Sequence, residues 1–419
     1  MSAAALQELR LYLAAHPVAY PLLRMVARAG PAVRVPGVGV VVSDATLARA
    51  VLGDPERFRK DGPGSSGALW TPVLGPSVLL NMEGEAHRVL RRKLAGLLTP
   101  ASAGQLCERV LTPELDRLRA RLTAGERVDL VGVMRVAAGS VACALTGARS
   151  PADPAAAARA HRERFAKGEE VVAMVRLTTR ALPPAKVARA RAVLAEVTAD
   201  AARAWRDAGP ATVPGRMRAL GLTEREAVGA AGAFFLTATE TVASLVPRLI
   251  ALLADSGQLD RVVADRALLP GAVEEALRVT TPSPAMLRSV AAEGEVGGVR
   301  VRPGDRVVIA TASCARLPGG FDLDRPAQPA LRHLWFGSGP HFCIGYPLAV
   351  AETIAVANAV LDCAPLRVTA RRPARGVLIP TWRTLEIQVV GGRRVGSGLP
   401  GRHDRRTRGA TAADAGRPA

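Results

Sequence analysis

A glycine-framed cysteine sets the tightest limit on how this chain folds. The run is Phe336-Gly-Ser-Gly-Pro-His-Phe-Cys343-Ile-Gly345, and an apolar stretch with helical character follows it. Glycine permits positive φ and lets the backbone approach a flat ligand closely. Cys343 is therefore expected just before a helix N-terminus, where free N–H groups and the helix dipole favour an anion. The pattern predicts a site for a thiolate, which is a strong ligand for iron.

Cysteine usage and hydropathy limit the class of protein. The five cysteines include no C-x-x-C pair, so neither a zinc knuckle nor a disulfide framework is predicted. The first residues lack a basic segment followed by an apolar core, which argues against a secretory signal. The longest charge-free stretch, residues 62–82, is broken by prolines and glycines and is typical of a loop. We expect a cytoplasmic protein without a membrane span.

The net charge of +19 raises the question of an acidic partner or nucleic acid. Four of the 56 basic residues are lysine and 52 are arginine, which is typical of a genome-wide codon bias. The basic residues are not interleaved with aromatic ones as in single-strand binders. The prediction is therefore no nucleic acid, with an arginine-rich nucleic-acid binder as a minor alternative.

Two helices carry the polar residues of most interest. Residues 83–98 read as a helix, on which His87 and Arg91 are four apart and share a face. Their spacing suits an ordinary solvated basic face equally well. A longer helix is predicted from residue 222 to about 255, opened by a capping box of Thr223 and Glu226. An acid and an alcohol, Glu240 and Thr241, interrupt its apolar middle. Burying polar side chains costs free energy unless they have partners, so their presence there needs a structural or functional explanation.

The remaining patterns predict a mainly α fold with a small β region. Residues 33–43 are β-like, Asp44 is a candidate helix cap, and residues 296–309 suggest a hairpin around Pro303-Gly304-Asp305. Residues 54–80 read as a long loop containing Trp70, and such loops are more often functional than idle. One domain is predicted over residues 1–395, followed by a disordered Arg/Gly/Ala-rich tail over 396–419.

The cysteine segment resembles the haem-binding loop of the cytochrome P-450 family. The fixed places of that loop are filled by Phe336, Gly339, His341, Cys343 and Gly345. The helix after it keeps the family's Leu-Ala and Glu, although valine replaces the usual arginine between them. The resemblance implies the cytochrome P-450 fold, a single haem-binding domain with haem b, and Cys343 as the iron ligand, with Phe336 and Gly345 framing the haem.

The resemblance also assigns roles along the chain, from about residue 35 to 390. It implies haem propionate binding by His87, Arg91, Arg288 and His341. It implies a structural network of Glu275, Arg278 and Arg325. It implies a substrate pocket that includes Trp70, Phe234, Thr237, Ala238 and Ala285. It implies catalytic roles for Thr241 and Glu240, in a run where Ala238 stands in place of the usual glycine.

The function implied is a haem-thiolate monooxygenase that uses O2 to hydroxylate, epoxidise or oxidatively couple a hydrophobic small molecule in secondary metabolism. No dinucleotide-type glycine fingerprint is present, so electrons from NAD(P)H are expected through a ferredoxin or flavodoxin with its reductase. Basic residues at Arg88, Arg92 and Lys93 are expected to face that acidic donor. A peroxide-driven or rearranging enzyme is an alternative that Glu240 and Thr241 argue against. A haem-based gas sensor is another, but it would need an output domain, and none is visible.

Overall fold

The computed structural model describes residues 2–174, 182–210 and 212–390. The expected tail over 396–419 lies outside the described residues. The helices, in chain order, are α1 (Ala3–Ala15), α2 (Ala19–Ala29), α3 (Ala45–Gly53), α4 (Ser66–Leu74), α5 (Gly84–Ala95), α6 (Pro100–Thr123), α7 (Leu130–Thr146), α8 (Pro154–Met174), α9 (Pro184–Asp207), α10 (Val213–Ala219), α11 (Glu224–Ala238), α12 (Glu240–Asp255), α13 (Leu259–Ala264), α14 (Leu269–Thr280), α15 (Thr311–Arg316) and α16 (Tyr346–Leu361). The prediction of a mainly α fold is confirmed.

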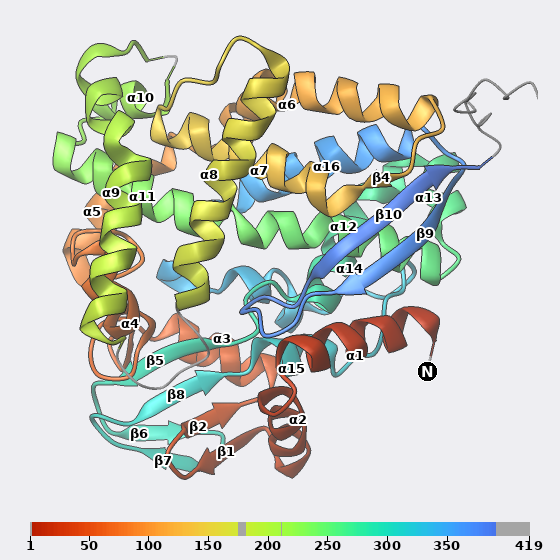
Figure 1. The fold of residues 1–419 in the computed structure, drawn as a ribbon. Coiled ribbons are helices and arrows are strands. Elements are labelled where there is room, and N and C mark those ends of the chain that lie inside the picture. The colour runs from red at the N-terminus through yellow and green to blue at the C-terminus, as the bar shows by residue number, and fades with distance from the viewer. Residues whose placement is uncertain (1, 175–181, 211, 391–419) are drawn as a thin grey trace, which may run out of the picture.

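The strands form three small sheets. The largest has the order β1 (Ala32–Val35), β2 (Gly39–Val42), β8 (Arg306–Ile309), β5 (Met286–Val290) and β3 (Phe58–Arg59). The second has the order β4 (Val128–Asp129), β10 (Trp382–Val389) and β9 (Leu366–Pro373), and the third pairs β6 (Gly294–Val296) with β7 (Val299–Val301). Figure 1 shows the five-stranded sheet below the helical body, with α1 and α2 along the lower edge.

The main hydrophobic core lies between the central helices. Its buried side chains come from α5, α6, α7, α11, α12, α14 and α16, and a second cluster packs α3 against the five-stranded sheet. In the part of the chain that the structure describes, the run Glu224–Asp255 is the one helix long and apolar enough to cross a membrane, and 78% of its most apolar window is buried inside the protein. That run therefore forms the interior of the fold.

The long central helix spans Glu224–Asp255, close to its predicted bounds, and has one irregular residue in its middle. Its capping box forms as expected, but Thr239 separates α11 from α12. Thr237, Thr239 and Thr241 each donate a side-chain hydrogen bond to the carbonyl four residues earlier. Such back-bonding bends helices. Thr239 is also fully buried against α8, where a Cβ added to Gly168 would lie 3.0 Å from its hydroxyl oxygen. A tertiary contact thus coincides with the break.

Two local predictions are corrected. The segment over residues 54–80 contains β3 and α4, and Trp70 lies within α4 instead of a loop. The hairpin turn lies at Gly297-Gly298, between β6 and β7, and not at Pro303-Gly304. Both of these glycines have positive φ, 56° and 83°, as the tight turns of two-residue hairpins require. The strand after Pro303-Gly304, β8, pairs instead with β2 and β5.

The three residues that the family resemblance places in a structural network, Glu275, Arg278 and Arg325, contact one another in the structure. Arg278 Nε and Arg325 Nε contact the two oxygens of the Glu275 carboxylate at 2.7 and 3.1 Å. Arg278 is 3% exposed and also donates to the backbone carbonyls of Gly319 and Gly320. A buried pair whose remaining donors are satisfied fixes geometry much more firmly than an exposed one. The network therefore ties α14 to the segment that leads into the cysteine loop.

Candidate active site

The cysteine loop runs from Phe336 to the start of α16. The Cys343 amide donates to the Phe336 carbonyl at 2.9 Å, which closes the loop on itself. Gly339 has φ of +65°, and a Cβ there would lie 2.7 Å from the Leu52 carbonyl oxygen. The loop therefore requires glycine at this position for both conformation and space. The Phe336 ring also packs edge-on against Tyr346, with ring centroids 5.0 Å apart.

The Cys343 thiol sits at the N-terminus of α16, as predicted. The amides of Gly345 and Tyr346 donate to its sulfur. Surrounding protein atoms nevertheless raise the pKa of the thiol, although these amides and the charges of Lys60 and Arg91 act to lower it. The side chain still opens to solvent. A thiol of this kind is most readily deprotonated when its sulfur binds a metal cation, which releases the proton to water.

Four cationic or basic side chains gather beside the loop, and all four were predicted as site residues. The rings of His87 and His341 lie 4.2 Å apart, and Arg91, one turn after His87 on α5, lies close enough to Cys343 for their charges to interact. Arg288, on β5, is 4% exposed. Burial lowers the pKa of Arg288 to about 10 and that of His87 to about 4. Each group is therefore held in surroundings that disfavour its positive charge.

Two further members of the cluster, Glu83 and Lys60, were missed by sequence reasoning. His341 Nε2 lies 2.7 Å from a Glu83 carboxylate oxygen, and the Lys60 amide donates to the other oxygen. Burial acts to raise the pKa of Glu83, but these hydrogen bonds outweigh it and leave that pKa lowered. Burial, followed by the charge of Arg288, lowers the pKa of the Lys60 ammonium to about 7.

The pairing of two strands explains why Lys60 belongs to the basic cluster. β3 pairs with β5 in a register that sets Phe58 against Val290 and Arg59 against Ser289. Lys60 directly follows Arg59, so this register brings Lys60 opposite Arg288. The pairing joins residues more than 200 positions apart in the sequence, so a local pattern could not have revealed it.

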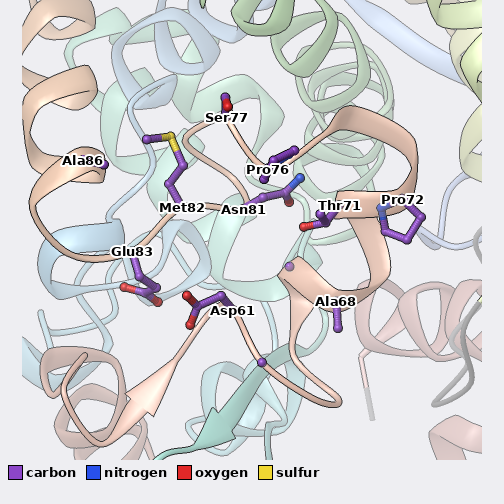
Figure 2. A pocket seen from close by; sticks show the side chains of 12 residues that line it. Asp61, Ala68, Thr71, Pro72, Pro76, Ser77, Asn81, Met82, Glu83 and Ala86 are labelled. Carbon is purple, nitrogen blue, oxygen red and sulfur yellow. The ribbon is translucent and has the colours of Figure 1, made fainter.

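A cavity of about 680 Å³ opens beside this cluster. It is lined by Asp61, Gly62, Gly67, Ala68, Thr71, Pro72, Pro76, Ser77, Asn81, Met82, Glu83 and Ala86. Figure 2 shows the Asp61 and Glu83 carboxylates on one side of the cavity and Thr71 and Pro72 on the other. The segment between β3 and α5, together with the first turn of α5, thus forms the walls.

The predicted pocket residues do not line this cavity. Trp70 packs instead among apolar side chains of α4, α8 and α9, because its α4 neighbours Ala68 and Thr71 take the cavity side. Phe234 is 9% exposed within the main core. Ala285 directly precedes β5 and packs in a small apolar cluster with residues of α2, β2 and β8. Thr237 is exposed and Ala238 half-buried on α11.

Glu240 and Thr241 lie next to each other in the chain but have different surroundings. Thr241 Oγ donates to the Thr237 carbonyl at 2.9 Å. Glu240 lines a small cavity of about 50 Å³ together with Arg135 and Glu169, which form an ion pair at 2.9 Å. Space of this size admits water where polar partners are present. Burial, followed by the charge of Glu169, raises the pKa of Glu240 to about 8.

The raised pKa of Glu240 predicts a pH-dependent stability. The folded pKa of about 8 exceeds the ordinary value of 4.5, so the folded protein binds the extra proton between these values. This contribution is fully present below about pH 4.5 and is lost as the pH rises through about 8. Relative to Glu240→Gln, the wild type should lose on the order of 2 kcal/mol of unfolding free energy over that range. Urea unfolding followed by circular dichroism at several pH values measures the difference, and parallel curves for the two proteins would contradict it.

Comparison with known proteins agrees with this fold and loop. Residues 260–362 match the sequence profile of the family described as "Cytochrome P450". Cytochrome P450-SU2 of Streptomyces griseolus is 32% identical over 73% of this chain and 75% of its own length. The 20-oxo-5-O-mycaminosyltylactone 23-monooxygenase of Streptomyces fradiae is 34% identical over 38% of this chain and 37% of its own length. The solved structure of P450BioI, in complex with an acyl carrier protein, superposes with a TM-score of 0.74 at 20% identity and covers 89% of this chain and 99% of that one.

The fold and the cysteine loop thus define a protein of the haem-thiolate class. The chain belongs to the cytochrome P450 family and is a cytochrome P450 monooxygenase of the soluble bacterial type. The family implies a haem cofactor, and the residues present fit one. Five basic groups (Lys60, His87, Arg91, Arg288 and His341) gather around one carboxylate, that of Glu83, and the buried Nδ1 of His341 has no hydrogen-bond partner among the described residues. Such a donor set suits a ligand that brings two carboxylates and an iron ion.

Proposed function

We propose that this monooxygenase hydroxylates, epoxidises or oxidatively couples a hydrophobic small molecule in natural-product biosynthesis. The observation that carries the proposal is the Cys343 thiol at the N-terminus of α16, beside a basic cluster and a cavity of about 680 Å³. The Streptomyces fradiae relative, named for oxidation of a mycaminosyltylactone, supports a natural product as the substrate class. The bound cofactor supplies O2 activation, which thiolate ligation favours.

The residues divide the remaining tasks. Cys343 would ligate the iron of haem b, with Phe336 and Gly345 framing the loop. His87, Arg91, Arg288 and His341 would hold the propionates, and the proximity of Lys60 supports adding it to this set. The walls formed by residues 61–86 would orient the substrate and exclude water.

The proposed function is tested with isotopically labelled oxygen. The purified protein, a ferredoxin, its reductase and NADPH are supplied with macrolide-type compounds chosen because they shift the haem absorption spectrum. Incorporation of one 18O atom from 18O2 into the product supports hydroxylation or epoxidation, whereas an unlabelled coupled product that forms only with NADPH and O2 supports oxidative coupling, in which both oxygen atoms are reduced to water. Product formation with hydrogen peroxide as the sole oxidant, and none with NADPH and O2, would instead identify the peroxide-driven alternative.

Removal of the propionate partners should weaken haem retention. The double variant Arg91→Ala/Arg288→Ala removes two cations from a cluster where each carboxylate needs charge-assisted donors once it leaves water. Transfer of haem to excess apomyoglobin should be at least about tenfold faster than in the wild type. Lys60→Met should give a smaller increase. Arg302→Ala, on the exposed turn between β7 and β8, is the control expected to change nothing, and an unchanged transfer rate in the double variant would refute the assignment.

External electrons would come from NAD(P)H through a ferredoxin or flavodoxin, as is general among bacterial relatives, in a cytoplasmic setting. Of the three basic residues expected to face the donor, Arg88 pairs with Glu85, and Lys93 pairs with Glu226 at 3.5 Å. Arg92 is exposed and makes no ion pair with any residue in the described part of the chain. Arg92 is therefore the best placed of the three to attract an acidic donor.

The reduction rate by ferredoxin should fall with ionic strength, because salt screens exposed charges beyond about 10 Å at 0.1 M. Arg92→Glu should lower the rate at low salt by about tenfold and flatten its salt dependence. Arg302→Glu makes the same charge change on the β7–β8 turn and should leave the slope nearly unchanged. Stopped-flow reduction under carbon monoxide measures both, and a salt-independent wild-type rate would contradict the steering role.

A further inference from the structure

Exposed apolar side chains gather on the first two helices. Of the eight large hydrophobic residues that are exposed in the described part of the chain, five lie on α1, on α2 and in the link between them: Leu6, Leu13, Val18, Leu22 and Met25. Val18, Leu22 and Met25 are 68%, 53% and 63% exposed. We call these five residues the N-terminal patch. Such a concentration exceeds the scattered single exposures that soluble surfaces ordinarily show.

The patch has the form of an amphipathic stripe. At about 100° per residue, Met25, Val18 and Leu22 fall within about 60° on one side of α2. Arg28 borders that side, and Arg24 lies about 40° further around the helix. The adjacent side of α2, which carries Val26 and Leu23, packs against the five-stranded sheet. Figure 1 shows α2 at the edge of the molecule beside β1 and β2. A stripe of this kind lies in an interface between apolar and aqueous phases.

The charge around the patch has one sign. Arg10, Arg24, Arg28 and Arg375 are exposed, and none of them forms an ion pair with another described residue. Arg375 is close because the next amide, that of Gly376, donates to the Ala14 carbonyl at 3.1 Å. The only acid among residues 2–30 is Glu8, which is 4% exposed. The patch therefore offers apolar surface and unpaired positive charge, with no exposed acid within its two helices.

The patch is held firmly on the protein. Glu8 pairs with Arg248, which is fully buried on α12, and with Arg316 at 3.0 Å. Tyr12 Oη donates to the Thr280 carbonyl at 2.7 Å. These contacts join α1 to the interior of the fold, so its exposed residues belong to a fixed surface and not to a fraying end. Docking through this surface would cost little ordering entropy.

We propose that the N-terminal patch docks the protein on an anionic phospholipid bilayer, as a peripheral contact without a membrane span. Apolar side chains would enter the boundary between headgroups and acyl chains, and the arginines would contact lipid phosphates. A second copy of the chain fits less well, because a symmetric contact would bring arginines against arginines. The segment 391–419 fits less well for the same reason, since it carries seven arginines and two aspartates.

Vesicle sedimentation tests the docking surface with the full-length haem protein. Binding is expected to vesicles of phosphatidylcholine with 30% phosphatidylglycerol and not to phosphatidylcholine vesicles. Leu22→Ser/Met25→Ser should lower the partition coefficient at least about tenfold, and Arg24→Gln/Arg28→Gln should do so comparably. Val89→Ser, which alters an exposed hydrophobic residue on α5, is the matched control and should bind like the wild type. The carbonyl-bound spectrum of each variant verifies folding and does not depend on the substrate.

Other occupants would give different results, and each would overturn the proposal. Equal binding by Leu22→Ser/Met25→Ser, lost only at high salt, would indicate nonspecific attraction of a basic protein. A dimer seen by light scattering and abolished by that double variant, without vesicle binding, would indicate a second copy. Vesicle binding that appears only after deletion of residues 391–419 would indicate that this segment covers the patch.

Discussion

Replacement of Cys343 by serine should abolish the red-shifted Soret band of the reduced, carbonyl-bound protein. That band reports thiolate ligation, and Cys343 is the cysteine that combines an open side chain with two backbone amides aimed at its sulfur. A serine hydroxyl keeps the shape but cannot supply a thiolate at neutral pH. The expected loss of the band is complete, and it is measured by a carbon monoxide difference spectrum after haem reconstitution.

The other cysteines provide the controls. Burial raises the pKa of Cys107 and of Cys314 to about 12, so neither is suited to act as a thiolate. Cys363 is half-buried, and its sulfur lies near the Ala359 carbonyl. Cys363→Ser should therefore keep the band. A Cys343→Ser protein that keeps the band, together with a different cysteine variant that loses it, would show that the ligand has been misassigned.

The cysteine loop could be predicted from the sequence because its determinants are local. The glycines, the cysteine and the helix start all lie within about ten residues, and their backbone requirements can be read from residue type. The capping box of Thr223 and Glu226 is local in the same sense. His87 and Arg91 follow from helical periodicity once a helix is assumed.

The missed features depend on contacts between distant segments. Lys60 reaches the basic cluster because β3 pairs with β5, and Glu83 becomes part of it through His341. Trp70 does not line the cavity of about 680 Å³, because α4 packs its apolar side against α8 and α9. The helix break at Thr239 coincides with the close approach of α8 at Gly168. Each of these features depends on tertiary packing, which the propensities of the individual residues do not encode.

Replacement of Thr241 by alanine should divert electrons from product to hydrogen peroxide. The surrounding helix is apolar, so protons have to arrive through fixed hydroxyls and ordered water. Thr241 Oγ donates to the Thr237 carbonyl, which leaves its oxygen free to accept a hydrogen bond from water or substrate. Glu240 faces the cavity bounded by Arg135 and Glu169, and both of these are about one-third exposed, which supports a link to solvent.

Product formation and peroxide release consume the same two electrons, so their ratio reports how protons are delivered. Thr241→Ala should keep haem content, substrate binding and the rate of electron uptake, while the ratio of product to NADPH consumed falls by about tenfold or more. Thr241→Ser restores the hydroxyl and should recover much of the ratio. Thr237→Ala should have a weaker effect, since the Thr237 hydroxyl lies one turn earlier on the same face and donates to the Ala233 carbonyl.

The comparison of these variants separates a chemical role from a structural one. A loss of helix geometry would affect Thr241→Ala and Thr241→Ser alike, and it would lower haem content and substrate binding as well as coupling. A loss of proton delivery affects the ratio and spares those properties, and Glu240→Gln should then reduce the ratio too, with an enlarged solvent isotope effect. If Thr241→Ala leaves the ratio unchanged, proton delivery does not pass through this hydroxyl, and Thr237 or a hydroxyl of the substrate becomes the better candidate.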